Sequence, residues 1–173
     1  MKVLQPSSRD CFVCGVVNPS GLHLSFYQIG PGEVTAEYIV SPQYQGYPGV
    51  VHGGIVAAML DETAGRSQMG VDHPRFMYTA RLDISYRKPV PVGQPLRLVG
   101  KALDSRRHVA RAVGYIYDQQ GNLLAEAQAL LIDIPEEKLA AVDMEGLGWR
   151  VYSDEERADL TPALDHAPHG ENV

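Results

Sequence analysis

A histidine, a glycine pair and a carboxylate stand close together in the stretch "HGGIVAAMLDE". His52 can exchange a proton near neutral pH or orient a ligand by a hydrogen bond. A ligand can approach the main-chain amides of Gly53 and Gly54 closely, because these residues carry no Cβ. Asp61 lies among alanine, methionine and leucine, where partial desolvation is costly unless the carboxylate is paired or used. These groups suit chemistry at a carbonyl, in which amides stabilise an oxyanion and a carboxylate acts as base or nucleophile.

Each of these residues also has a simpler interpretation. The two glycines can serve only to allow a tight entry into a helix. Asp61 and Glu62 can be a pair of solvated charges, and His52 can make a structural hydrogen bond instead of transferring a proton. If the segment is helical, Glu62 is turned about 100° from Asp61, so only one of the two carboxylates can face a given site. The pattern alone leaves these alternatives open.

A helix must position the glycines and the carboxylate, and the pattern predicts one over residues 53–69. Its first amides would lack intrahelical partners and would carry the positive end of the helix dipole. Small residues lie one turn from Asp61 on its own face, so another element can approach there: Ala57, Ala58, Ala64 and Gly65. Eight residues at ~1.5 Å each place Asp61 about 12 Å from the Gly53 amide. One reacting group cannot touch both, so a shared site needs two antiparallel copies of the helix and therefore a homodimer.

The remaining pattern predicts strands, bounded by glycine- and proline-rich turns. Two strands flank Gly30-Pro31-Gly32 within residues 21–40, and four more follow the helix, over 78–87, 96–105, 108–118 and 123–134. Strict alternation in the first of these four places Thr79 on the same face as Arg81, opposite Leu82. One helix against a largely antiparallel sheet of about six strands is an α+β fold. Because one helix cannot cover six strands, the open face or edge is expected to meet another subunit.

The chain divides into three segments: an N-terminal segment 1–24, a main domain 25–135 and a C-terminal extension 136–173, partly helical or flexible. The first segment contains Cys11 and Cys14 in "CFVCG", which is half of a zinc-knuckle pattern without a second cysteine pair. A packing or turn role is favoured, and metal binding or redox chemistry stays open. We expect no bound metal.

Composition excludes several classes of function. The net charge of −6 argues against nucleic acid as a partner, since such surfaces are usually basic. The N-terminus lacks the apolar core of a signal peptide, and no apolar run approaches ~20 residues, so we expect no membrane segment. With only two cysteines and no export signal, a cytoplasmic location is the expectation.

The stretch "PGVVHGGIVAAMLDETAG" closely resembles the signature of hotdog-fold acyl-CoA thioesterases of the phenylacetate-pathway and thioesterase-superfamily-member type. "TARLDISYRKPVPVGQPL" and "VGYIYDQQGNLLAEAQALLI" are similar to the strands that follow in that family, and "CFVCGVVNPSGLHLSF" to the N-terminal segment of one branch. The likeness covers about residues 11–134. It implies an antiparallel sheet wrapped around a central helix, working as a homodimer or a dimer of dimers.

The resemblance also implies hydrolysis of acyl-CoA to a free acid and coenzyme A, without a cofactor. Asp61 matches the family's catalytic carboxylate, Gly53 the backbone amide that holds the thioester oxygen, and Thr79 a hydroxyl that positions water or substrate. Gly46 falls where some relatives carry a polar side chain, which leaves a second polarising role to Gln45 or Tyr47. Asp61 of the opposite subunit would act as a general base or would form an anhydride.

The expected substrate-binding residues surround the same helix start. They are His52, Gly54, Gly46, Tyr47, Arg87 and Lys88. The two basic side chains, or Arg106 and Arg107, could meet the phosphates of coenzyme A. Four apolar side chains could line an acyl tunnel: Tyr47, Met59, Phe76 and Met77. The alternatives are a non-catalytic acyl-CoA-binding module and a hotdog hydratase, whose histidine-containing motif we do not find.

Overall fold

The computed structural model describes residues 2–70 and 75–161. Predictions for the other residues, including the last part of the C-terminal extension, lie outside this range. The elements follow one another in this order: β1 (Val3–Leu4), β2 (Tyr27–Gly30), β3 (Glu33–Ile39), the 3₁₀ helix η1 (Pro42–Tyr44), α1 (Gly53–Gln68), β4 (Met77–Tyr86), β5 (Pro95–Arg106), β6 (Val109–Tyr117), β7 (Leu123–Asp133), α2 (Glu136–Ala140) and α3 (Asp154–Leu160).

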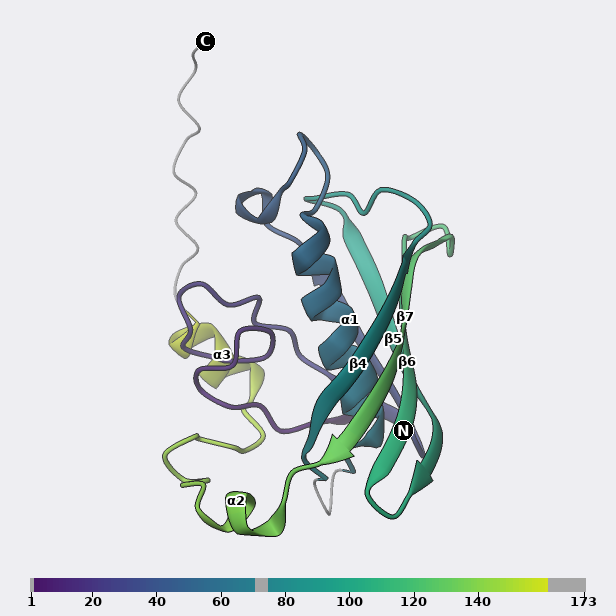
Figure 1. The fold of residues 1–173 in the computed structure, drawn as a ribbon. Coiled ribbons are helices and arrows are strands. Elements are labelled where there is room, and N and C mark those ends of the chain that lie inside the picture. The colour runs from purple at the N-terminus through teal and green to yellow at the C-terminus, as the bar shows by residue number, and fades with distance from the viewer. Residues whose placement is uncertain (1, 71–74, 162–173) are drawn as a thin grey trace.

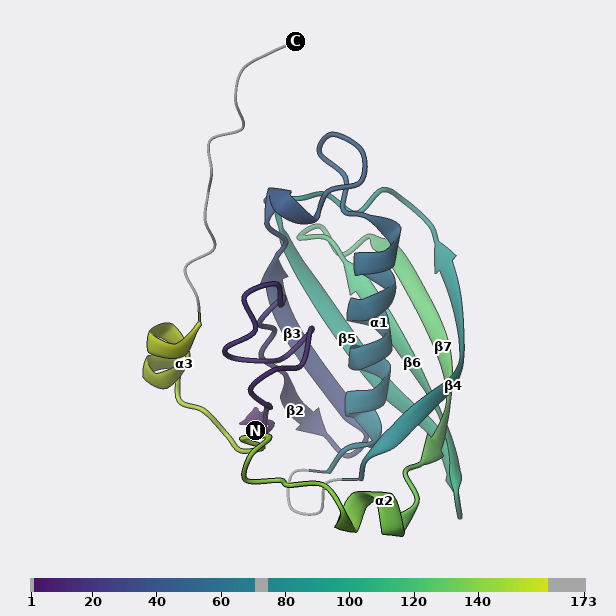
Figure 2. The ribbon, with the colours of Figure 1, turned by 60° about the vertical axis from the view of Figure 1, so that its left-hand side comes forward.

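The strands form one antiparallel sheet in the order β1-β2-β3-β5-β6-β7-β4, and the sheet curves around α1 (Figures 1 and 2). The predicted α+β hotdog architecture is therefore confirmed, as are the central helix and the six expected strands. A seventh strand, the two-residue β1, was not predicted because so short an element leaves no period in the sequence. The strand expected from residue 21 begins only at Tyr27, since His23 has a φ of 57° and interrupts the extended chain.

Two glycines on neighbouring strands allow α1 to lie directly on the middle of the sheet. Gly100 of β5 pairs with Gly114 of β6. A Cβ on Gly100 would overlap the Thr63 carbonyl oxygen, and one on Gly114 would lie 2.8 Å from the Leu60 carbonyl oxygen. The helix is thereby seated closer than side chains would permit, with Leu60 and Thr63 fully buried against the strands.

The predicted alternation is wrong at Thr79, because β4 contains a bulge there. The register between β4 and β7 shifts there, so that Thr79 pairs with Leu131 while Arg81 pairs with Leu130. Opposed residues of an antiparallel pair point to the same face, and Leu131 is buried on the helix side of the sheet. The extra residue, Ala80, therefore turns Thr79 to the helix side, whereas strict alternation placed it with Arg81 on the other face.

The N-terminal segment lies beside α1, on the side opposite strands β4–β7, and α3 lies beyond it (Figures 1 and 2). The Gln5 amide group donates to the carbonyl oxygens of Arg66 and Met69 at 3.2 and 3.0 Å. The Arg157 guanidinium of α3 donates to the Ser7 hydroxyl at 2.6 Å. In the described range, no helix is both long and apolar enough to cross a membrane.

The outer face of the sheet exposes apolar side chains over β4, β6 and β7: Tyr78, Val109, Leu130 and Ile132. β4 also ends the strand order, so this ten-residue strand pairs with β7 on one side and with no strand of the described residues on the other. Contact with another subunit through such surfaces stays a prediction.

Candidate active site

His52 caps the start of α1 and leaves one amide available. Its Nδ1 accepts a hydrogen bond from the Gly54 amide at 3.0 Å, so the proton of the neutral ring belongs on Nε2. The Gly53 carbonyl oxygen accepts a bond from the Tyr86 hydroxyl at 2.9 Å. Within the described residues, the Gly53 amide donates to no acceptor, and Gly53 is exposed. A carbonyl oxygen placed at this helix end would find a free donor at Gly53 rather than at Gly54.

A surface cavity of about 890 Å³ lies beside this helix start. It brings together six residues that the sequence singled out: Gly46, Tyr47, His52, Gly53, Arg87 and Lys88. Tyr47 is 81% exposed, and the Arg87 guanidinium is held by the Glu126 carboxylate at 2.6 Å. The cavity therefore combines an apolar wall, an exposed aromatic ring and basic side chains, which suits an elongated anionic ligand.

Gly46 lies close to the start of α1 at the rim of this cavity. A Cβ at this position would lie 3.2 Å from the Cα of His52, so a side chain would press on the helix start. Its amide donates to the Val50 carbonyl oxygen at 2.9 Å, which closes the loop. Neither contact gives Gly46 a polarising group of its own.

Asp61 and Thr79 meet in a second, smaller pocket of about 100 Å³ between α1 and β4. The Thr79 hydroxyl donates to Oδ1 of Asp61 at 2.7 Å. Burial raises the pKa of the half-buried Asp61 carboxyl, the Thr79 hydrogen bond acts to lower it, and the nearby Glu62 charge raises it further. The balance leaves the pKa above its usual value, so Asp61 holds a proton more readily than a solvated aspartate.

The two groups of residues lie in separate cavities of the chain. The pocket of Asp61 and Thr79 shares no lining residue with the cavity of His52 and Gly53. This agrees with the separation of about 12 Å that eight helical residues impose. A single copy therefore does not bring the carboxylate to the free amide.

The expected acyl-tunnel residues do not line one cavity in the described chain. Met59 is completely buried in the core, and Phe76 packs edge-on against Trp149 with ring centroids 5.1 Å apart. Met77 lines the pocket of Asp61, and Tyr47 lines the larger cavity.

The alternative phosphate-binding residues lie elsewhere. Arg106 ends β5 and Arg107 follows it, at the end of the sheet beyond Gln68. The Gln68 side chain at the C-terminal end of α1 donates to the Asp104 carbonyl oxygen there at 3.2 Å. Both arginines are therefore remote from the large cavity at the other end of the helix.

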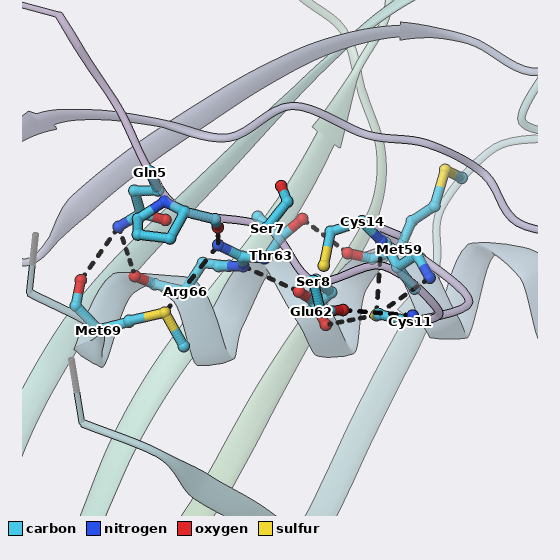
Figure 3. Close-up of polar contacts among 12 residues, drawn as sticks. Gln5, Ser7, Ser8, Cys11, Cys14, Met59, Glu62, Thr63, Arg66 and Met69 are labelled. Atoms are coloured by element: carbon cyan, nitrogen blue, oxygen red, sulfur yellow. Dashed lines mark hydrogen bonds and ion pairs between the residues drawn. The ribbon is translucent and has the colours of Figure 1, made fainter. Parts of the chain in front are cut away.

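Arg66 is a site neighbour that the sequence interpretation missed. Its guanidinium is 2% exposed and bonds Oε1 of Glu62 at 2.8 Å (Figure 3). It lies between the rings of Phe26 and Trp149, 5.1 and 5.2 Å from their centroids. The spacing of Glu62 and Arg66 by four residues was the available signal, because such residues face one another on a helix.

Comparison with known proteins agrees with the fold and the helix motif. Residues 48–125 match the family described as the thioesterase superfamily. The mouse (Mus musculus) acyl-coenzyme A thioesterase THEM4 is 31% identical over 96 residues, which are 54% of this chain and 40% of that protein. The crystal structure of the thioesterase superfamily protein RHA08564 superposes with a TM-score of 0.65 at 27% identity, over 72% of this chain and 63% of that one. The Streptococcus mutans protein smu.793, solved bound to acetyl-CoA, superposes with a TM-score of 0.58 at 19% identity, over 64% and 88% of the chains.

Residues 48–125 are thus similar to the thioesterase superfamily, and the chain shares the fold of the solved structures. The chain spans less than half the length of the curated relatives that it matches. The resemblance drawn from the helix motif is confirmed, since the matched segment contains that motif and the fold is the one that the resemblance implies.

Proposed function

We propose that the protein hydrolyses acyl-CoA thioesters at a site shared by two copies, with Gly53 from one copy and Asp61 and Thr79 from the other. The observation that carries this proposal is the Asp61–Thr79 pair: a half-buried carboxylate that accepts a hydroxyl bond at 2.7 Å. The cation nearest in sequence, Arg66, is engaged by Glu62 instead. A carboxylate oriented in this way keeps its basicity for the reaction.

The proposed chemistry uses the two ends of the site differently. The thioester oxygen accepts a bond from the Gly53 amide, and one such donor stabilises the tetrahedral oxyanion by roughly 3 kcal/mol. Thr79 holds Oδ1 of Asp61 and leaves Oδ2 to react. Oδ2 either takes a proton from a water molecule whose oxygen attacks the carbonyl carbon, or attacks that carbon itself to form an anhydride that water later hydrolyses to the free acid and the restored carboxylate. The bond to sulfur then breaks, and coenzyme A leaves as a thiolate, which needs no strong general acid.

The open edge of the sheet supports the shared site. β4 carries Thr79 and presents ten residues of unpaired edge, which is a template for pairing with another strand. If two copies join at β4 about a two-fold axis, their α1 helices lie antiparallel. Each Gly53 end then approaches the Asp61 of the other copy.

The large cavity supports the ligand class. Tyr47 offers a ring for the adenine, and Arg87 and Lys88 offer positive charge to the phosphates. Structural neighbours of the same fold were solved bound to acetyl-CoA and with coenzyme A.

The test is an assay of the purified chain against short, medium, long and aromatic acyl-CoAs, following release of free thiol. We expect turnover of at least one class. If no acyl-CoA is hydrolysed but coenzyme A derivatives bind, the chain is an acyl-CoA-binding module instead of an enzyme.

Mixing two inactive variants tests whether the site is shared. Gly53→Pro removes the proposed donor at the first helical position, where proline is tolerated, and Gly53→Ala keeps the amide as its matched control. Each of Gly53→Pro and Asp61→Asn should be inactive alone. After unfolding and refolding together, half of the dimers are mixed and each regains one intact site, so about a quarter of the wild-type activity should return. A site within one copy would show no recovery.

A further inference from the structure

The N-terminal CxxC turn contacts α1 beside the proposed catalytic carboxylate. Cys11, Cys14 and Glu62 offer two sulfur atoms and a carboxylate oxygen that all lie within 4.8 Å of one another (Figure 3). Both cysteines are free thiols. Nothing in the proposed thioesterase chemistry uses these three side chains.

We propose that Cys11, Cys14 and Glu62 bind a thiophilic divalent cation, for which Zn²⁺ is the appropriate test ion. Zn²⁺ binds cysteine sulfur at ~2.3 Å and carboxylate oxygen at ~2.0–2.2 Å, which separates sulfur from oxygen by roughly 3.5 Å in a tetrahedral site. The Cys11 sulfur lies 4.0 Å from Oε2 of Glu62. Small side-chain rotations therefore suffice to bring the donors into coordination, and water can complete the four-coordinate shell because Cys11 and Glu62 are only partly buried.

The turn is built to present the Cys11 sulfur. The amides of Val13 and Cys14 donate to it at 3.3 and 3.5 Å, and such donors stabilise a thiolate on a metal. The Gly15 amide closes the turn on the Cys11 carbonyl oxygen at 2.9 Å. A Cβ on Gly15 would overlap that oxygen, so the turn requires glycine directly after the second cysteine.

The two carboxylate oxygens of Glu62 have different partners. Its Oε1 accepts from the buried Arg66 guanidinium at 2.8 Å, whereas Oε2 faces the Cys11 sulfur. Arg66 thus fixes the carboxylate from behind, as an outer-shell partner does at a metal site.

The charges of the proposed site balance when the cation binds. The cation displaces the two thiol protons, which pass to solvent, and two metal–sulfur bonds and one metal–oxygen bond form without oxidation or reduction. Two thiolates and one carboxylate exceed a divalent cation by one negative charge, and the Arg66 guanidinium balances that charge. Binding should therefore tighten as pH rises, because the protons leave more easily.

The test uses the full chain, reduced and freed of metal with a chelator, and does not depend on thioesterase activity. Co²⁺ serves as the spectroscopic probe and Zn²⁺ as the competitor. We expect one equivalent of Co²⁺ to give thiolate-to-cobalt charge-transfer absorption, Zn²⁺ to abolish it, and Zn²⁺ to raise the melting temperature.

Variants decide whether the named side chains are the ligands. Cys11→Ser and Cys14→Ser should each weaken Zn²⁺ binding at least about 100-fold and remove the charge-transfer band, whereas Asp10→Asn, an exposed acid in the same turn, should bind as the wild type does. Glu62→Gln tests the third ligand but also deprives Arg66 of its partner, so the half-buried Cys11→Ser carries the decision if that variant unfolds. Absence of the band, or equal Zn²⁺ affinity in Cys11→Ser, would overturn the proposal. Failure of the reduced chain to bind Zn²⁺ while it readily forms a Cys11–Cys14 disulfide would also overturn it.

Discussion

Asp61 and Glu62 are neighbours in the sequence, yet they occupy opposite environments on α1. Asp61 faces β4, accepts one bond from the Thr79 hydroxyl, and has a raised pKa because burial outweighs that bond. Glu62 faces the N-terminal segment and is bonded at 2.8 Å to Arg66, whose side chain is 2% exposed. The turn of about 100° between consecutive helical residues separates the two environments.

The difference teaches which carboxylate can do chemistry. A carboxylate bonded to a buried guanidinium is already engaged by a counter-charge and is not free to act on a substrate. A carboxylate held only by a hydroxyl, and partly desolvated, keeps its affinity for a proton. This contrast supports our proposal that Asp61 is the reacting group, whereas Glu62 holds Arg66 and contacts the CxxC turn.

The largest expected effect is on turnover. Asp61→Asn should reduce kcat for the best acyl-CoA substrate by about 100-fold to 1000-fold, because it removes the base or nucleophile without changing side-chain shape. Glu62→Gln, the same chemical change one residue away, should cost less than about 10-fold while the protein stays folded. The comparison fails if the two variants lose activity equally, with circular dichroism confirming that both are folded.

The second effect is on stability, where the change at Glu62 should matter more than the change at Asp61. Glu62→Gln should lower the free energy of unfolding by about 2–3 kcal/mol in urea, because the buried Arg66 charge loses its partner. The protein should be metal-free for this measurement. Glu33→Gln is the control, since its pair with Lys101 is about half exposed and should contribute much less to the free energy of unfolding. Equal losses in the two variants would show that the Arg66 pair is no stronger than a surface pair.

Thr79 offers a smaller change that sharpens the role of Asp61. Thr79→Ala should reduce kcat roughly 10-fold and should raise the pKa of Asp61, because the hydroxyl bond acts to lower it. The acid limb of the rate–pH profile should therefore move to higher pH. Thr79→Ser retains the hydroxyl and should restore both values. An unshifted acid limb in Thr79→Ala would assign the limb to another group.

The smallest expected effect is a gain in stability when Asp61 is replaced by asparagine. The folded-state pKa of Asp61 lies above the unfolded value, so its deprotonation disfavours the folded state as pH rises through that range. Asp61→Asn should accordingly melt at a slightly higher temperature than the wild type near neutral pH. The difference should vanish in acid, where the carboxyl is protonated in both states. A lower melting temperature for the variant at neutral pH would mean that the Asp61 charge is stabilised in the fold.

The sequence by itself determined the local elements. The helix begins at the glycine pair and ends within a residue of the predicted boundary, and the four strands predicted after it are present, with the alternation of β4 broken at Ala80. Residues near one another in the chain encode these features, because helix periodicity and turn residues act over a few positions. The spacing of Gly53 and Asp61 follows from the same local geometry.

The tertiary structure decided three contacts between distant segments that the local sequence pattern does not encode. The bulge at Ala80, set by pairing with β7, turned Thr79 toward Asp61. The packing of the N-terminal segment buried Arg66 and thereby neutralised Glu62. The same packing brought a CxxC turn to that carboxylate across about fifty residues of sequence. Strand register and the burial of a charge depend on contacts between distant segments, so only the folded chain fixes them.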